Sequence, residues 1–592
     1  MLDTHRVSLT NLDAMAAGRS DAAVVAQLRQ ADRSRRLTLL RAVLDAAAEL
    51  NPAMAPLPPL GEAWTLLIEA QQRDPAATDR VLAHPHTGLW AANVLQRLAK
   101  GGSGDPPLWA DLGGLHRLAT AAAIRAGHDF RSRVPVWRGR LMLPTLGLAD
   151  VRSRRDWDFA QVHAERGHVL VRGPSGSVQL PDDGVADGPG WLPLRSLPIG
   201  DGELFLDDID PYREFDGPLP PQRLDAGEVA QWSEILNATW RLLSEHHPAI
   251  AAELTAGLTT LVPRAAIDRF TPYSASHNDV FGSLVLSRPP DATTFAATLV
   301  HEFQHSKLGV LLVLVDLLDP AGDNGSARLY APWRDDPRPP AGLLHGAYSF
   351  LGVTAFYRGH YPVAEGLAAR AAQFEFAYRR EQTAQAVGTL LAEAVPSALG
   401  RRFLATAQDR LREWGTEPLP ADITEAAARA NLDHRLSWRL RHLRSTDAVV
   451  AELAAAWLRN RPCPFVPAAP PSLVPATGSA GHARLTLTRT WLTDPDLYDV
   501  YRAEPELAMA EITGMSAADL ALVDGDTTIA AELYRRQLTL TPDSPAAWAG
   551  FALATRHPVL LSRPELVSAV HREVRRQRGV APDPDRLARW LG

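Results

Sequence analysis

The chain has 592 residues, several times the usual length of one domain, so more than one hydrophobic core is expected. Its single cysteine, Cys463, excludes an internal disulfide framework and a cysteine-rich metal site, which leaves nitrogen and oxygen ligands for any bound metal. The 61 Lys and Arg residues are balanced by 68 Asp and Glu residues, so no overall basic field would attract nucleic acid.

Neither export nor a membrane span is expected. The N-terminal stretch MLDTHRVSLTNLDAMAAGRS mixes charges from residue 3 onward and lacks the apolar core of a secretory signal. The longest apolar run, Leu308 to Leu318, contains Asp316 and is shorter than the roughly 20 residues that cross a bilayer. We predict a buried core helix for this run and a cytoplasmic protein without membrane contact.

In chain order, the pattern predicts a mainly α, multidomain protein of the α+β class. Residues 1–130 have apolar side chains at helical spacing and form an N-terminal helical region. Residues 131–225 contain short β-branched or alternating runs between Gly, Pro and Asp, which predict a small β-containing segment. Residues 226–460 return to helical patterns and form the predicted catalytic domain, followed by a Pro-rich linker at 461–483 and a helical unit at 484–592.

Within the last unit, the stretch GDTTIAAELYRRQLTLTPDSPAAWAGFALA (525–554) spaces its small, aromatic and proline residues much as a tetratricopeptide helix pair does. One such pair is not an array, because about three repeats are needed for independent stability. We therefore expect a TPR-like helical hairpin that packs on the catalytic body.

The residues that carry chemistry are centred on the motif His301-Glu302-Phe303-Gln304-His305. Histidines four residues apart on a helix lie on one face, so both imidazoles can bind one metal ion. A start signal at 289–291, Pro-Pro-Asp, and apolar residues at helical spacing predict that this stretch is a helix. Glu302 would lie about 100° round the helix, within reach of a metal-bound water or of a ligand.

A metal needs a further ligand, and the sequence offers several. A metzincin would have a third histidine at position 311, where this chain has Leu311, so that protease class is excluded. The nearest downstream glutamate, Glu365, lacks the pattern that supplies a glutamate ligand in other zinc proteases. His345, the first histidine after the motif, is the preferred third ligand, and a satisfied core histidine is the alternative. His360 and Asp316 are weaker candidates.

Two arginines precede His345. Arg334 and Arg338 lie in the stretch LYAPWRDDPRPPAG, and a guanidinium group offers the paired donors that bind a carboxylate, as an acidic co-substrate would require. The alternative is that both pair with Asp335 and Asp336 in a surface turn.

Taken together, SHNDVFGSLVLS (276–287), LVHEFQHSKLGVLL (299–312), YAPWRDDPRPPAGLLHGAYSFLGV (330–353) and the closing helical unit resemble the HExxH-domain proteins of bacterial peptide natural-product pathways. That family is described as 2-oxoglutarate-dependent peptide β-hydroxylases, which act on ribosomally made precursor peptides. The resemblance covers roughly residues 226–592.

The resemblance implies iron(II), Fe(II), bound by His301, His305 and His345, with 2-oxoglutarate held by Arg334 or Arg338. Three imidazoles would leave a more positive centre than the usual two histidines and one carboxylate. The co-substrates would hydroxylate the β-carbon of side chains in a precursor peptide, the expected partner.

In that reading Glu302 orients a ligand or water by hydrogen bonding, and Ser276, His277 and Asn278 line the substrate channel, although turn chemistry explains this sequence equally well. The alternative enzyme is a zinc (Zn) metallopeptidase in which Glu302 activates water. A third hypothesis is a peptide-binding scaffold with a vestigial motif. The sequence predicts neither the precursor peptide nor the oligomeric state.

Overall fold

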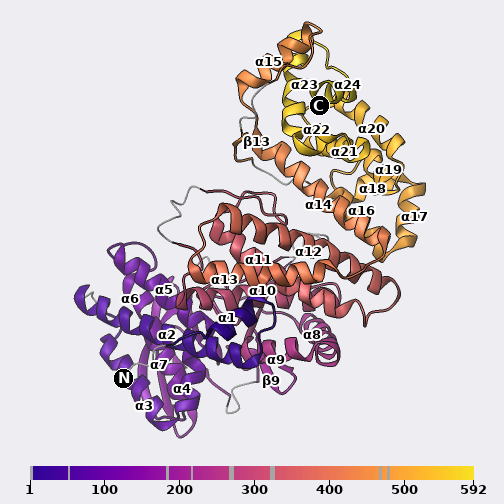
Figure 1. Ribbon diagram of the computed structural model, residues 1–592. Helices are drawn as coiled ribbons and strands as arrows, with labels where there is room; N and C mark the ends of the chain where they lie inside the picture. The colour runs from indigo at the N-terminus through magenta and orange to yellow at the C-terminus, as the bar shows by residue number, and fades with distance from the viewer. Residues whose placement is uncertain are drawn as a thin grey trace. The chain divides into compact units, whose positions relative to one another are not determined.

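The computed structural model describes residues 5–50, 54–181, 186–214, 218–265, 273–319, 327–465, 470–476 and 481–592. Within these ranges the protein is mainly helical with several β-sheets, which confirms the mixed α+β class (Figure 1). Internal contacts divide the chain into two units. The first comprises Met1–Met15 and Arg19–Val315, and the second comprises Ala16–Gly18 and Asp316–Gly592. This division falls inside the predicted catalytic domain, and the five predicted segments stay predictions.

The N-terminal region is helical, as its periodicity predicts. Its helices are α1 (Leu9–Ala16), α2 (Ala22–Leu50), α3 (Leu60–Arg73), α4 (Pro75–Leu82), α5 (Pro85–Ala99), α6 (Leu108–Leu112) and α7 (Gly114–Arg125). Helix α3 packs against α7, and α2 packs against α5.

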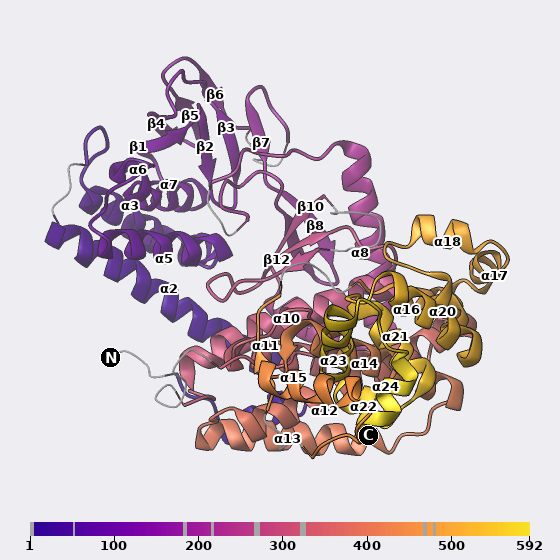
Figure 2. The ribbon, with the colours of Figure 1, turned by 90° about the horizontal axis from the view of Figure 1, so that it is seen from above.

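The strands predicted between residues 131 and 225 are present and belong to two sheets. The first sheet has seven antiparallel strands in the order β6-β5-β4-β1-β2-β3-β7 (Figure 2). Their bounds are β1 (Phe130–Trp137), β2 (Arg140–Leu143), β3 (Gly147–Asp150), β4 (Trp157–Glu165), β5 (His168–Arg172), β6 (Ser177–Gln179) and β7 (Trp191–Pro193).

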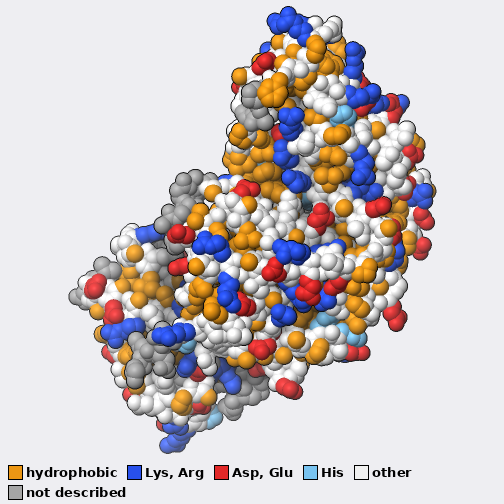
Figure 3. Space-filling model, in the orientation of Figure 1, with side chains coloured by type: hydrophobic (Ala, Val, Ile, Leu, Met, Phe, Trp, Pro, Cys, Tyr) orange, Lys and Arg blue, Asp and Glu red, His pale blue; other side chains and the backbone are white. Residues whose placement is uncertain are grey.

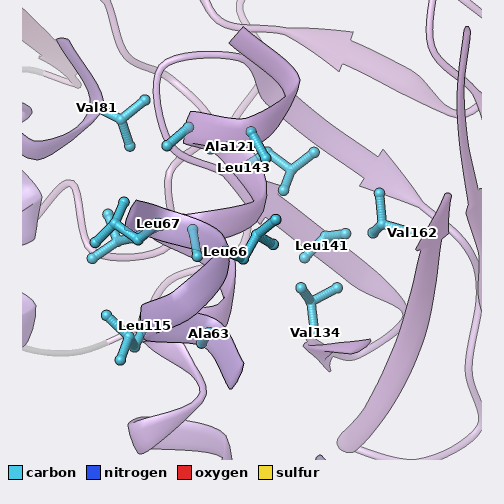
Figure 4. Close-up of a cluster of buried hydrophobic side chains, with 14 of the residues drawn as sticks. Ala63, Leu66, Leu67, Val81, Leu115, Ala121, Val134, Leu141, Leu143 and Val162 are labelled. Atoms are coloured by element: carbon cyan, nitrogen blue, oxygen red, sulfur yellow. The ribbon is translucent and has the colours of Figure 1, made fainter. Parts of the chain in front are cut away.

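One face of this sheet is covered by helices. Figure 4 shows Leu66 of α3 between the helical side chains and those of the strands, where Leu141 and Val134 point toward it. All the side chains labelled in that view belong to one buried apolar cluster. Burial of a side chain of this size stabilises the fold by about 1.5–3 kcal/mol, so this layer is a substantial core of the first unit.

The second sheet leads to the motif helix. Its strand order is β11-β12-β10-β9-β8, with β10 parallel to both β9 and β12. The bounds are β8 (Arg195–Ile199), β9 (Gly202–Leu206), β10 (Thr260–Arg264), β11 (Ser274–Ala275) and β12 (Ser283–Ser287). Between and after these strands lie α8 (Ala226–His246), α9 (Pro248–Gly257) and α10 (Ala292–Leu314).

Helix α10 packs against α8, α2 and α9. A fully buried lysine, Lys307, fixes it to α9 through an ion pair of 2.5 Å with Glu253. The helix ends at Leu314, and Val313 is 55 % exposed. The prediction of one buried helix from Leu308 to Leu318 is therefore correct up to Leu314 and wrong beyond it, where the chain is no longer helical although Leu317 is 1 % exposed.

The second unit is built from helices. They are α11 (Pro340–His360), α12 (Gly366–Glu393), α13 (Ala398–Gly415), α14 (Ala421–His442), α15 (Asp447–Leu458), α16 (Ala483–Thr493), α17 (Pro495–Ala503), α18 (Pro505–Glu511), α19 (Ala517–Val523), α20 (Thr527–Leu540), α21 (Pro545–Thr555), α22 (Pro558–Ser562), α23 (Pro564–Arg578) and α24 (Pro584–Leu591). Helix α12 packs against α11, α13 and α14, and α14 packs against α21.

The predicted helical hairpin corresponds to α20 and α21, which pack on each other. Its centre is tight: a Cβ atom added to Gly550 would lie 2.1 Å from the ring of Tyr534, which is 1 % exposed. The predicted linker is described in part, and there β14 (Ser472–Leu473) pairs with β13 (Leu443–Arg444). The TPR-like character of the unit stays a prediction.

Two observations bear on the surroundings of the protein. Among the described residues, no helix combines the length and the apolar character that crossing a membrane requires. On the face shown in Figure 3, basic and acidic side chains are interspersed, in line with the balanced charge of the sequence.

Candidate metal centre

The motif helix α10 begins where the sequence predicts. The Asp291 side chain caps it, accepting hydrogen bonds of 2.8 Å from the backbone N–H of Thr294 and of 2.7 Å from the Thr294 hydroxyl. Such a cap satisfies one of the N–H groups that the first turn leaves without a helical partner. Its apolar residues, including Phe295, Leu299 and Phe303, are buried.

The two motif histidines lie on the accessible stripe of this helix. From 294 to 311, Thr294, Thr298, His301 and His305 are partly exposed, and the other positions are buried. Their spacings of four, three and four residues put them along one face. The helix thus presents both imidazoles away from the core, as a reactive metal site requires.

The rings of His301 and His305 are close to each other. Their centroids are 4.9 Å apart and the ring planes meet at 80°. With metal–nitrogen distances of about 2.1 Å, two imidazoles bound side by side to one ion have centroids roughly 4.5–5.2 Å apart. The spacing therefore fits a shared metal. Within the first unit, no described histidine, cysteine or acidic residue joins this pair in a group of three potential ligands.

Glu302 is turned away from the accessible stripe and is held by two serines. Its side chain is 4 % exposed, and its two carboxylate oxygens each accept a hydrogen bond of 2.7 Å, from the hydroxyls of Ser274 and Ser276. Ser274 belongs to β11, so these bonds join the second sheet to the motif helix. Sequence reasoning missed Ser274, because a single serine in a short strand carries no signal of its own.

The residues predicted to line a substrate channel form a turn beside α10. The N–H of Val280 donates to the carbonyl of His277 at 3.0 Å, and the His277 ring accepts from the N–H of Asp279 at 3.2 Å. The side chain of Asn278 lies against α10, since a Cβ atom on Gly309 would be 2.9 Å from its amide oxygen. These contacts agree with the turn chemistry of the segment, and a role in substrate binding stays a prediction.

His345, the predicted third ligand, is on α11 in the second unit. It is partly exposed, and the residues on both sides of it are buried. Burial lowers the pKa of its imidazole, which keeps the ring neutral and able to bind a metal. Its neighbour Gly346 accommodates Trp333, whose ring would be 2.4 Å from a Cβ atom at that position. Ligation by His345 stays a prediction.

Arg334 and Arg338 both hydrogen bond to Asp336. Nε of Arg334 donates to one carboxylate oxygen at 2.7 Å, and Nη1 of Arg338 donates to the other at 3.2 Å. Partial burial opposes ionisation of Asp336, but these hydrogen bonds outweigh it and lower its pKa. The guanidinium groups thus meet on one carboxylate, as the surface-turn alternative expects for Asp336. That alternative also named Asp335, whose backbone carbonyl accepts a hydrogen bond from His442.

A second group of potential ligands was not found from the sequence. His84, His86 and Asp207 are all buried, and their ligand atoms lie within 4.8 Å of one another, so the group could hold a metal ion. Burial lowers the pKa of His84 to about 3. The short sequence His84-Pro85-His86 is the only local signal, since the aspartate comes from a strand end far along the chain.

No protein-family model and no curated protein matches this sequence. The family resemblance inferred from the residues therefore remains a hypothesis, which the site geometry must support on its own.

Proposed function

We propose that the protein is an iron(II)- and 2-oxoglutarate-dependent hydroxylase of peptide side chains, with its metal on α10. The observation that carries this proposal is the position of His301 and His305 on the accessible stripe of a buried helix, with ring centroids 4.9 Å apart. Imidazole nitrogens suit iron(II), and a site with few protein ligands leaves positions for co-substrates.

The environment of Glu302 favours a hydroxylase over a zinc metallopeptidase. In a peptidase this carboxylate would take a proton from metal-bound water, so it needs an oxygen that faces the metal. Here both oxygens accept hydrogen bonds from serine hydroxyls, and the side chain is 4 % exposed. Such a carboxylate positions α10 against β11, which supports an orienting role for Glu302.

We propose roles for three further residues that the sequence singles out. We propose His345 as the third ligand, as the family resemblance implies, and burial, which lowers the pKa of its imidazole, is compatible with this role. We propose Arg334 and Arg338 as the anchor of the distal carboxylate of 2-oxoglutarate. In the structure both guanidinium groups are paired with Asp336, so binding of the co-substrate would require them to exchange that carboxylate for the one of 2-oxoglutarate.

Iron(II) and 2-oxoglutarate, once bound, would supply the oxidising chemistry. In the proposed reaction, one atom of dioxygen would enter a C–H bond of the peptide, and the other would enter the succinate that forms from 2-oxoglutarate with release of carbon dioxide. The chain itself would bind the metal, orient the co-substrate carboxylate and present the β-carbon of the peptide. The TPR-like unit and the turn at 276–278 are the proposed contacts for the precursor peptide.

The test is incubation of anaerobically purified protein with iron(II), 2-oxoglutarate, oxygen and a precursor peptide, followed by mass spectrometry. We expect a peptide heavier by one oxygen atom and an equal amount of succinate. His301→Ala should abolish both, Glu302→Gln should retain the metal, and His128→Ala, at a histidine outside the proposed site, should behave as wild type. Cleavage of the peptide with zinc bound would refute the hydroxylase and support the peptidase.

A further inference from the structure

Four buried residues of the first unit surround one point at the start of α5. His84 occupies the N-cap position of this helix without a capping hydrogen bond from its side chain, and His86 lies in the first turn, whereas Asp207 and Asp210 lie in the loop after β9. Their exposed fractions are 2 %, 4 %, 0 % and 4 %. We call these residues the buried His–Asp cluster. Its members lie outside the motif helix, and the proposed reaction does not use them.

The two aspartates are oriented by their own loop. Oδ1 of Asp207 accepts backbone hydrogen bonds from Ile209 at 3.2 Å and Asp210 at 2.9 Å, and Oδ1 of Asp210 accepts one from Tyr212 at 2.7 Å. The second oxygen of each carboxylate faces the His86 ring. Oδ2 of Asp207 is 3.6 Å and Oδ2 of Asp210 is 3.4 Å from Nδ1 of His86. Both carboxylates thus converge on one imidazole nitrogen.

Five polar atoms of the cluster lack hydrogen bonds among the described residues. They are both ring nitrogens of His84, both ring nitrogens of His86 and Oδ2 of Asp207, for which no hydrogen-bond partner is found among the described residues. The centroids of the two rings are 4.8 Å apart and their planes meet at 85°. Buried polar groups are nearly always satisfied, and each orphan costs about 1–3 kcal/mol. Several at one point indicate that a binding partner belongs there.

The charge of the cluster defines that partner. Two carboxylates removed from water need compensating positive charge. Protonated His86 could balance one of them, because burial opposes its ionisation but the charges of Asp210 and Asp207 outweigh burial and raise its pKa. The guanidinium group of Arg36, in contrast, is already paired with Asp32 at 2.6 Å. A divalent cation would balance both carboxylates, and two imidazoles with two carboxylates are a donor set for tetrahedral zinc.

We propose that the buried His–Asp cluster binds a structural divalent transition-metal ion, zinc in the first place, through His84, His86 and Asp207, with Asp210 as the fourth ligand. This ion is distinct from the one proposed on α10. It fastens the start of α5 to the loop after β9, and thereby the N-terminal helices to the second sheet.

The available space favours a structural role over a catalytic one. The cavity beside His84, His86 and Asp210 has a volume of about 30 Å³. That space accommodates about one water molecule, whereas pockets for small-molecule ligands have roughly 300–1,000 Å³. Neither 2-oxoglutarate nor a peptide reaches such an ion, so its chemistry is limited to holding protein ligands.

The test is metal analysis of the full-length protein, purified without chelators and dialysed against zinc-free buffer. Asp207→Asn, which preserves side-chain size, and His86→Ala should each lose about one zinc ion per chain, and a chelator should lower the melting temperature of the wild type but not of these variants. His116→Ala, at another buried histidine of the same unit, is the control and should keep its zinc. Folded variants with the wild-type zinc content would refute the cluster site.

A second variant separates this proposal from the proposed function and holds even where Asp207→Asn fails to fold. The double variant His301→Ala/His305→Ala removes the α10 site alone. It should retain about one zinc ion per chain with nitrogen and oxygen ligands in X-ray absorption. A double variant free of metal would overturn the buried site, whereas loss of hydroxylation with zinc retained is the expected result for two separate sites.

Discussion

Removing the hydroxyls of Ser274 and Ser276 tests whether they hold Glu302 in place. Each donates to a different carboxylate oxygen at 2.7 Å. A hydrogen bond to a charged group contributes about 1.5–3 kcal/mol, so Ser274→Ala or Ser276→Ala should lower the free energy of unfolding of the first unit by that amount. The double variant should lose about 3–5 kcal/mol, because the carboxylate stays buried without these donors.

The assay is chemical unfolding followed by circular dichroism, with Ser153→Ala as the matched control. The Ser153 hydroxyl also donates to a carboxylate, that of Asp158 at 3.1 Å, but both side chains are partly exposed. Its removal should cost less than about 0.5 kcal/mol. Repeating Ser276→Ala in a Glu302→Gln background completes a double-mutant cycle, in which a coupling of about 1–2 kcal/mol is expected.

The same variants distinguish the two roles of Glu302. If the serine variants cost no more than the control and show no coupling to Glu302, the hydroxyls do not hold the carboxylate. The inference that Glu302 orients α10, and is unsuited to act as a hydrolytic base, would then be refuted.

Three further results are expected. Asp291→Ala should destabilise the first unit by about 1 kcal/mol in urea titrations, because it removes the N-cap of α10. Gly550→Ala should cost about 1–3 kcal/mol or more, because the added methyl group overlaps the ring of Tyr534, and unfolding monitored by tryptophan fluorescence would detect this. Burial lowers the pKa of His116 and of His571 to about 4, so both stay neutral when folded but take up protons when unfolded below about pH 6.5. Stability should therefore fall between pH 7 and 5, by up to about 2 kcal/mol for each histidine, and a stability curve that is flat over this range would contradict the assignment.

The local features of α10 could be predicted from the sequence, because they depend on neighbours along the chain. The Asp291 cap and the buried Phe295 and Leu299 follow from start signals and helical periodicity, and the helix forms as expected. The strands of the first sheet could also be predicted from the sequence, because alternating apolar runs between turn residues indicate them. The end of the helix at Leu314 could not be predicted, because the apolar run in the sequence continues past it to Leu318.

Features that depend on distant segments were not predicted. Strand β10 pairs with β9 and β12, and this parallel pairing joins segments separated by whole helices. The same holds for Ser274 beside Glu302 and for Asp207 beside His86, where each partner by itself is an unremarkable polar residue. Periodicity and spacing carry no information about such contacts, so only the folded chain brings them together.

The two histidine pairs differ in their exposure to solvent. His301 and His305 lie on the stripe of α10 that the core does not cover, so the metal that we propose there would keep positions open for exchange with co-substrates. His84 and His86 have ring centroids at nearly the same spacing, 4.8 Å compared with 4.9 Å, but are sealed together with two carboxylates. Ring spacing alone therefore cannot separate a reactive centre from a structural one. Burial and charge can separate the two kinds of site. The ligands of a buried site must themselves neutralise the metal ion, whereas an accessible site can complete its coordination from solution.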